Sequence, residues 1–142
     1  MLKENKMEIK ITFPGGKKVN AEINGFIIHT DQPLKYGGEG SAPSPFEHFL
    51  ASIGTCAGFY VLSFCDKRKI STEKIFLVQR LEYGKTENGK TFIEKIVIEI
   101  TVPPAFPEKY HKALIKVADQ CTVKKTIMNP PKFEIKTIVR KG

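Results

Sequence analysis

Apolar and polar residues alternate in the first part of the chain, from Met7 to Thr30. The alternation covers residues 8–13 and 18–23, and a further run follows at residues 26–30. A period of two is typical of half-buried β-strands. The run Pro14-Gly15-Gly16 and the dipeptide Asn24-Gly25 separate these segments, and both are typical of turns. The pattern therefore predicts a meander of three short strands.

A loop and then a long helix are predicted next. Residues 31–45 are rich in glycine, proline and serine, and a loop of this length in a small domain is often functional. Ser44 suits the N-cap of a helix, Pro45 its first position and Glu47 its third, which together form a capping box. Apolar residues then recur at spacings of three and four, and Glu47 is the only charged residue between Ser44 and Asp66. We expect a buried helix over about residues 45–69.

The second half of the chain predicts a hairpin, two helices and a last strand. Residues 73–83 and 91–102 read as the paired strands, and Pro107 opens a helix. A short helix is predicted over residues 122–127, and residues 133–139 alternate as a strand. Strands and helices do not alternate regularly, so the fold class is α+β. The length of 142 residues predicts one domain over residues 1–142.

Composition narrows the class of protein. No uninterrupted apolar stretch reaches the ~18 residues of a membrane helix, and no secretory signal is recognised, so a cytoplasmic protein without a membrane partner is expected. The net charge of +8 raises the hypothesis of a basic, nucleic-acid-associated protein. Most lysines alternate with acidic and apolar residues, however, which favours an ordinary solvated surface and no nucleic-acid partner.

Three cysteines are the candidates for chemistry. Cys56 lies in the middle of the long helix, and Cys65 follows nine residues later on the opposite face, about 180° away. Cys121 lies just before the short helix, where the helix N-terminus with Lys124 and Lys125 would favour a thiolate. Buried, unreactive thiols are the alternative for each cysteine. The chain has no Cys-x-x-Cys pair and its three histidines are scattered, so a zinc site is not expected.

Three segments together resemble a known family. They are the Gly/Pro-rich segment 38–47, its continuation through residues 50–55 into Cys56, and the run Cys121–Ile127. The chain is similar to the OsmC/Ohr family of osmotically induced and organic-hydroperoxide-resistance proteins, and most to its YhfA-like branch. The resemblance covers roughly residues 7–140. It implies antiparallel sheets packed around a long central buried helix, completed as an intertwined homodimer.

The same resemblance implies a thiol peroxidase of the oxidative and osmotic stress response. Cys56 would be the peroxidatic thiol, attacking an organic hydroperoxide to give a sulfenic acid and an alcohol. Cys121 would be the resolving thiol, and a dithiol such as a lipoylated protein would regenerate the pair. No metal, flavin or other cofactor is implied. An apolar substrate pocket at the dimer interface would be lined by Phe46, Phe49 or Tyr60.

Two further residues are candidates for the catalytic site. Lys35 is the nearest cation in the loop where family peroxidases carry an arginine, and it would lower the pKa of the thiol without the bidentate fork of arginine. Glu47 is the carboxylate of the helix start, about 13.5 Å along the helix from Cys56 and on its opposite face. It would serve the site of the other subunit, or act only in the capping box.

Two other hypotheses of function remain open. In the first, the dimer cavity holds a small apolar or thiol ligand with little or no turnover, as suggested by the absence of an arginine before Arg68. In the second, the basic dimer associates with nucleic acid, and its binding would depend steeply on salt.

Overall fold

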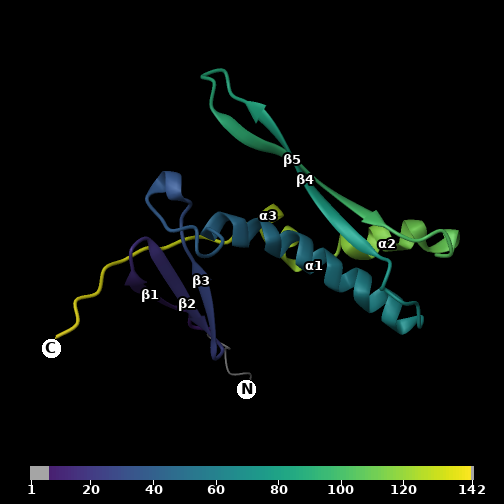
Figure 1. The fold of residues 1–142 in the computed structure, drawn as a ribbon, viewed down its shortest axis with the longest axis horizontal. Helices are drawn as coiled ribbons and strands as arrows, with labels where there is room; N and C mark the ends of the chain where they lie inside the picture. Colours follow the sequence, from purple (N-terminus) through teal and green to yellow (C-terminus); the bar gives the residue numbers. More distant parts are fainter. Residues whose placement is uncertain (1–6, 142) are drawn as a thin grey trace. The chain divides into compact units, whose positions relative to one another are not determined.

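The computed structural model describes residues 7–141. It forms two compact units, Met1–Ala51 and Ser52–Gly142, and the helix α1 (Pro45–Lys67) runs from the first into the second. Figure 1 shows the elements along the chain. The predicted α+β class is confirmed, with two antiparallel sheets and one long helix. One domain over residues 1–142 stays a prediction.

The first unit contains the three-stranded sheet that the alternation predicts. Strands β1 (Lys10–Gly15), β2 (Lys18–Ile23) and β3 (Phe26–Thr30) pair in chain order, each antiparallel to the next. Asn24 and Gly25 form the tight turn between β2 and β3 with φ of 49° and 82°. Two positive φ angles match the twist of a two-residue hairpin, which explains the asparagine–glycine pair.

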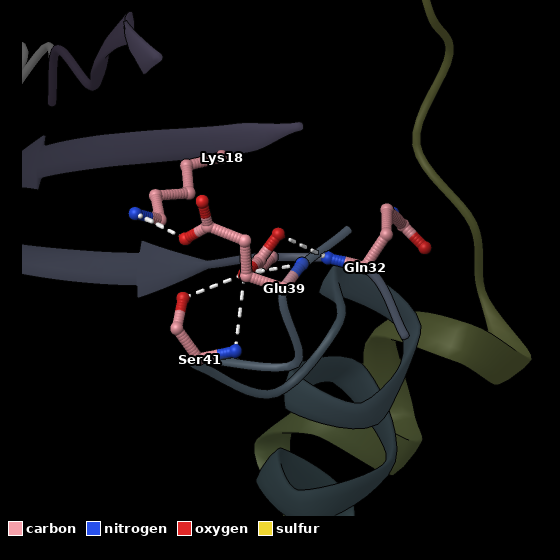
Figure 2. A network of polar contacts seen from close by, with 5 residues as sticks. Lys18, Gln32, Glu39 and Ser41 are labelled. Carbon is pink, nitrogen blue, oxygen red and sulfur yellow. Dashed lines mark hydrogen bonds and ion pairs between the residues drawn. The ribbon is translucent and has the colours of Figure 1, made fainter. Parts of the chain in front are cut away.

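A buried carboxylate organises the loop between β3 and α1. Asp31 is 1% exposed and accepts hydrogen bonds from the backbone N–H groups of Gln32, Glu39 and Ser41 at 2.7, 3.3 and 3.0 Å. The Ser41 hydroxyl donates a fourth at 2.6 Å. Figure 2 shows these donors converging, with the Lys18–Glu39 ion pair beside them. The donors, with the Ser41 hydroxyl first, lower the pKa of Asp31 to about 2.

The helix α1 has the predicted start and a defined end. The Ser44 N–H donates to Glu47 Oε1 at 3.0 Å and the Glu47 N–H to Ser44 Oγ at 3.3 Å, so the capping box is confirmed. At the other end Lys69 is left-handed, with φ of 55°. Lys69 N–H bonds Asp66 O and Ile70 N–H bonds Cys65 O, which is a Schellman motif. This motif ends the helix two residues before the predicted boundary.

The second unit packs one face of α1 onto a long hairpin. Strands β4 (Phe76–Lys85) and β5 (Thr91–Thr101) are antiparallel, and two helices follow, α2 (His111–Ala118) after the 3-10 turn η2 (Glu108–Tyr110), and α3 (Thr122–Met128). A further 3-10 turn, η1 (Leu34–Tyr36), lies in the loop of the first unit. The core cluster of the second unit consists of Val61, Phe64, Cys65, Phe106 and Leu114.

The other apolar side chains of α1 are not buried within the described chain. Phe59 is 60% and Leu62 49% exposed, so the predicted burial holds for one face of the helix. By length and composition α1 also meets the criterion for a membrane-crossing helix. A core helix of a soluble protein meets the same criterion; here Val61 and Phe64 pack in the core cluster, and 28% of the apolar window is buried.

The last predicted strand is wrong for the described chain. Residues 133–139 have no regular secondary structure there, and the side chains of Phe133 and Ile135 are 85% and 96% exposed. The alternation is real, but a strand needs a neighbour to accept and donate its backbone hydrogen bonds. Within residues 7–141 the segment pairs with neither sheet.

Candidate active site

Cys56 and Cys121, which are 65 residues apart in the sequence, are brought together in the second unit. Cys56 lies on α1 and is partly exposed, whereas Cys121 is the N-cap residue of α3 and is buried. A hydrogen bond joins the two sulfur atoms, and both thiols are free. Because α3 starts directly after Cys121, its first turn lies against the middle of α1.

The surroundings of Cys56 favour its thiolate. The backbone N–H of Val123 is the main donor to Cys56 Sγ, followed by the Cys121 thiol and the Thr122 N–H. Burial opposes these donors, but the net effect is to lower the pKa of Cys56. Hydrogen bonds to the charged form are one of the physical causes that stabilise it. Cys56 is therefore the better nucleophile of the two at neutral pH.

Cys121 has the opposite balance. Burial raises the pKa of Cys121, although the Lys124 N–H donates to its Sγ at 3.4 Å. Its S–H proton has two acceptors, the Ile53 carbonyl at 3.7 Å and Cys56 Sγ. Once Cys56 ionises, donation to its thiolate becomes charge-assisted and stronger. The shared hydrogen bond therefore lowers the pKa of Cys56 and raises that of Cys121.

The expected stabilisation of a Cys121 thiolate by lysines is wrong. The Lys124 ammonium group forms an ion pair with Asp119, and Lys125 Nζ donates to Gln120 Oε1 at 2.9 Å. Neither ammonium group is among the causes of the shift at Cys121. The backbone N–H groups at the start of α3 act mainly on Cys56, the residue that faces them from the other helix.

Cys65 takes no part in the pair. It is fully buried in the core cluster, and this burial raises its pKa. The sequence places Cys65 on the helix face opposite Cys56 and leaves open whether it is a core or a surface thiol, and the structure shows it in the core.

Tyr60 is tied to the redox pair through α3. Tyr60 lies on α1, one helical turn after Cys56, and its hydroxyl is 3.3 Å from Thr122 Oγ1. Thr122 supplies one of the N–H groups that face Cys56. Tyr60 thus fixes the position of the first turn of α3, a role that the sequence did not indicate.

An apolar cleft of about 470 Å³ opens beside Cys121. Alternate residues of β5, residues of α2 and one residue of α1 contribute to its walls, and the lining includes the polar residues His111, Asp119 and Lys124. Its lining residues are Ile53, Ile96, Ile98, Ile100, Val102, His111, Leu114, Ile115, Ala118, Asp119, Cys121 and Lys124. We call it the Cys121 cleft.

The residues predicted for a substrate pocket do not line the Cys121 cleft. The rings of Phe46 and Phe49 contact each other with centroids 5.7 Å apart and are exposed in the described chain, and Tyr60 contacts Thr122. Their place in a pocket at a dimer interface stays a prediction. In the sequence, only the isoleucines at every second position of β5 could have indicated the cleft, but any half-buried strand shows the same alternation.

Glu47 and Lys35 both lie in the first unit. Glu47 is held in the capping box, and its hydrogen bonds with Ser44 lower its pKa. Lys35 is exposed, with its ammonium group 5.0 Å from the centroid of the Tyr36 ring. These contacts account for both residues locally, and a role for either at a thiol stays a prediction.

Removal of the Tyr60 hydroxyl tests its link to Cys56. In Tyr60→Phe the first turn of α3 is held less firmly, so we expect the alkylation profile of Cys56 against pH to move upward. The rate with iodoacetamide at pH 7 should fall about twofold, the effect of weakening one modest hydrogen bond. The matched control is Tyr83→Phe, on β4, which should leave the profile unchanged. Identical profiles for Tyr60→Phe and wild type would contradict the link.

These features define an α+β protein that carries a hydrogen-bonded pair of thiols between a long helix and the start of a short one. The family model of the OsmC-like protein matches residues 38–136, and the chain belongs to this family. A search of curated proteins found no match. The assignment to the YhfA-like branch stays a prediction.

Solved structures share the fold. One is a protein of Psychrobacter arcticus 273-4 named for osmotic stress induction and a detoxification response (TM-score 0.69, 20% identity, 89% of this chain and 91% of that chain covered). Another is an OsmC-like protein of unknown function from Vibrio cholerae (TM-score 0.65, 16% identity, 86% of this chain and 93% of that chain covered). A third is an organic hydroperoxide resistance protein from Elizabethkingia anophelis (TM-score 0.57, 20% identity, 89% of this chain and 91% of that chain covered). At these identities the likeness shows the fold.

Proposed function

We propose that the protein is a cysteine-based peroxidase that reduces organic hydroperoxides, with Cys56 as peroxidatic and Cys121 as resolving thiol. The observation that carries this proposal is the hydrogen-bonded pair, in which one thiol has a lowered pKa and the other a raised one. Membership of the OsmC-like family and fold relatives named organic hydroperoxide resistance proteins support it.

The first step is oxidation of Cys56. Its thiolate attacks the terminal oxygen of ROOH, the O–O bond breaks, and Cys56 becomes a sulfenic acid while RO⁻ takes up a proton to give the alcohol. The N–H groups of Thr122 and Val123 keep the sulfur ionised before the attack. The reaction needs no metal or flavin, because sulfur undergoes the redox change.

The second step forms a disulfide. The Cys121 sulfur attacks the sulfenic sulfur, hydroxide leaves and is protonated to water, and the Cys56–Cys121 bond forms. The existing contact between the two sulfur atoms means that little movement is needed to reach bonding geometry. A dithiol then reduces the disulfide, and a lipoylated protein is a candidate reductant.

We further propose that the working form is a homodimer in the cytoplasm. The exposed apolar side chains of α1, such as Phe59 and Leu62, and the unpaired segment 133–139 support a second copy as the occupant of these surfaces. Exposed apolar surface of this extent is typical of an interface. No nucleic-acid partner is proposed.

The alternative is a binding protein with little turnover. The Cys121 cleft favours it, because an apolar cleft of about 470 Å³ is large enough for a small ligand. In that case the thiols would stay reduced during ligand binding.

The deciding experiment is stopped-flow oxidation of the reduced protein with cumene hydroperoxide and with H2O2. We expect the organic peroxide to be consumed at least about 100-fold faster than by free cysteine, because positioned donors raise the thiolate fraction and orient the attack. Consumption no faster than by free cysteine with either peroxide would refute the enzyme. Saturable binding of an apolar probe without oxidation would then support the binding protein.

A further inference from the structure

Two sulfur atoms accept the hydrogen bonds of the first turn of α3. The first N–H groups of a helix have no partner inside it, and in α3 the first internal bond joins the Lys125 N–H to the Cys121 carbonyl at 3.0 Å. Residues 122–124 come before that bond. The first two donate their N–H groups to Cys56 Sγ, and the third, Lys124, donates to Cys121 Sγ at 3.4 Å. The thiol pair is therefore also the cap of α3.

The stability of α3 depends strongly on this cap. The helix has seven residues, and none of these seven is buried. Helices this short are marginal without tertiary support. The contacts of α3 with Tyr60 and Asp119 lie at the surface, where hydrogen bonds and ion pairs contribute little. Loss of the sulfur cap is thus expected to loosen the helix.

Formation of a disulfide changes both sulfur atoms of the cap. The two thiols lose two protons and two electrons to the oxidant as the bond between Cys56 and Cys121 forms. Cys56 can then no longer be a thiolate, and the N–H groups of residues 122 and 123 lose a charged acceptor. Hydrogen bonds to a charged acceptor are about twice as strong as those to a neutral one. Cys121 also loses the proton that it donates to the Ile53 carbonyl at 3.7 Å.

We propose that α3 is a redox-sensitive element, in which the disulfide between Cys56 and Cys121 removes the sulfur cap and the first turn of α3 opens. Cys121 itself stays bonded to α1, so the change is confined to the residues that follow it. The inference rests on the proposed function for the disulfide, although a chemical oxidant can form the same bond. It goes beyond the peroxidase reaction, because it couples the oxidation state of the thiols to the shape of the chain after them.

Hydrogen–deuterium exchange followed by mass spectrometry tests the opening of α3. The reduced full-length protein is compared with protein oxidised by diamide, which takes up the two protons and two electrons as a hydrazine. We expect peptides that cover residues 122–128 to exchange at least about tenfold faster after oxidation, as for the loss of a helix cap. Peptides of β4 are the internal control and should change less than about twofold. Equal or slower exchange of residues 122–128 after oxidation would overturn the proposal.

Variants at position 121 separate the loss of the cap from the disulfide itself. A serine hydroxyl caps a helix, whereas alanine offers no acceptor. Without any oxidant, we expect Cys121→Ala to exchange residues 122–128 at least about tenfold faster than reduced wild type, and Cys121→Ser to stay within about threefold of it. Diamide should change the exchange of residues 122–128 in neither variant. Equal exchange in Cys121→Ala and Cys121→Ser would show that the side chain at this position does not cap α3, and the proposal would fail.

The redox-sensitive element and the peroxidase can fail separately. If cumene hydroperoxide is consumed rapidly but oxidation leaves the exchange of residues 122–128 unchanged, the peroxidase stands and the redox-sensitive element is rejected. If diamide accelerates the exchange while no hydroperoxide is consumed, the outcome is reversed. If diamide forms no disulfide between Cys56 and Cys121, the redox-sensitive element is overturned, and the hydroperoxide rate of the reduced protein still decides the peroxidase.

Discussion

Replacing Cys56 by serine is expected to lower the rate of cumene hydroperoxide consumption at least about 1,000-fold, to the background of the remaining thiols. A serine hydroxyl stays protonated at neutral pH even beside the Thr122 and Val123 N–H groups, so the attacking anion is lost. Peroxide consumption followed by a colorimetric hydroperoxide assay at pH 7 measures this effect.

Two further variants locate the chemistry. Cys121→Ser should retain the first oxidation and stop after one equivalent of peroxide, with a sulfenic acid that a dimedone probe labels on Cys56. Cys65→Ala, which removes the thiol of the core cluster, should keep turnover within about twofold. Turnover by Cys56→Ser at the rate of wild type would reject Cys56 as the nucleophile.

Replacing Asp31 by asparagine is expected to lower Tm by about 5–10 °C at pH 7 and to remove part of the acid sensitivity of the fold. The four donors to the Asp31 carboxylate hold its pKa at about 2, below the ordinary value of 3.8. A carboxyl group whose pKa is lower in the folded state stabilises the protein above the unfolded value. That stabilisation is lost as pH falls through the folded value.

The measurement is thermal unfolding by circular dichroism between pH 2 and pH 7. Wild type should lose Tm steeply from about pH 4 down to about pH 2, and Asp31→Asn should have a shallower slope in that window. Glu22→Gln, an exposed carboxylate of β2 in the same unit, is the matched control and should follow wild type. Parallel slopes for Asp31→Asn and wild type would show that the carboxylate does not carry the acid response.

Local signals in the sequence predicted the elements well, because the interactions that set them are local. The Asn24-Gly25 turn and the Ser44–Glu47 capping box involve residues at most three apart, and both form as expected. The segment 133–139 carries an equally clear pattern, but pairing depends on a neighbour that a pattern does not specify. It was therefore predicted as a strand and is unpaired within the described chain.

The candidate site was predictable only in part. No spacing rule joins Cys56 to Cys121, and their pairing followed from resemblance to a family rather than from helical geometry. The start of α3 was predicted to favour the thiolate of Cys121, but its backbone donors act mainly on Cys56 of α1. Lys124 and Lys125 instead contact Asp119 and Gln120. Such contacts depend on tertiary packing, as does the Tyr60–Thr122 contact.

The buried thiol of Cys65 allows the opening of the second unit to be measured. Its sulfur is fully buried among Val61, Phe64 and Leu114, so an alkylating reagent reaches it only when that core separates. Under conditions in which reclosing outpaces labelling, the labelling rate of Cys65 reports the free energy of opening. Alkylation of the third thiol can thus record the stability of the second unit, without any substitution, in the same experiment that follows the redox state of the other two.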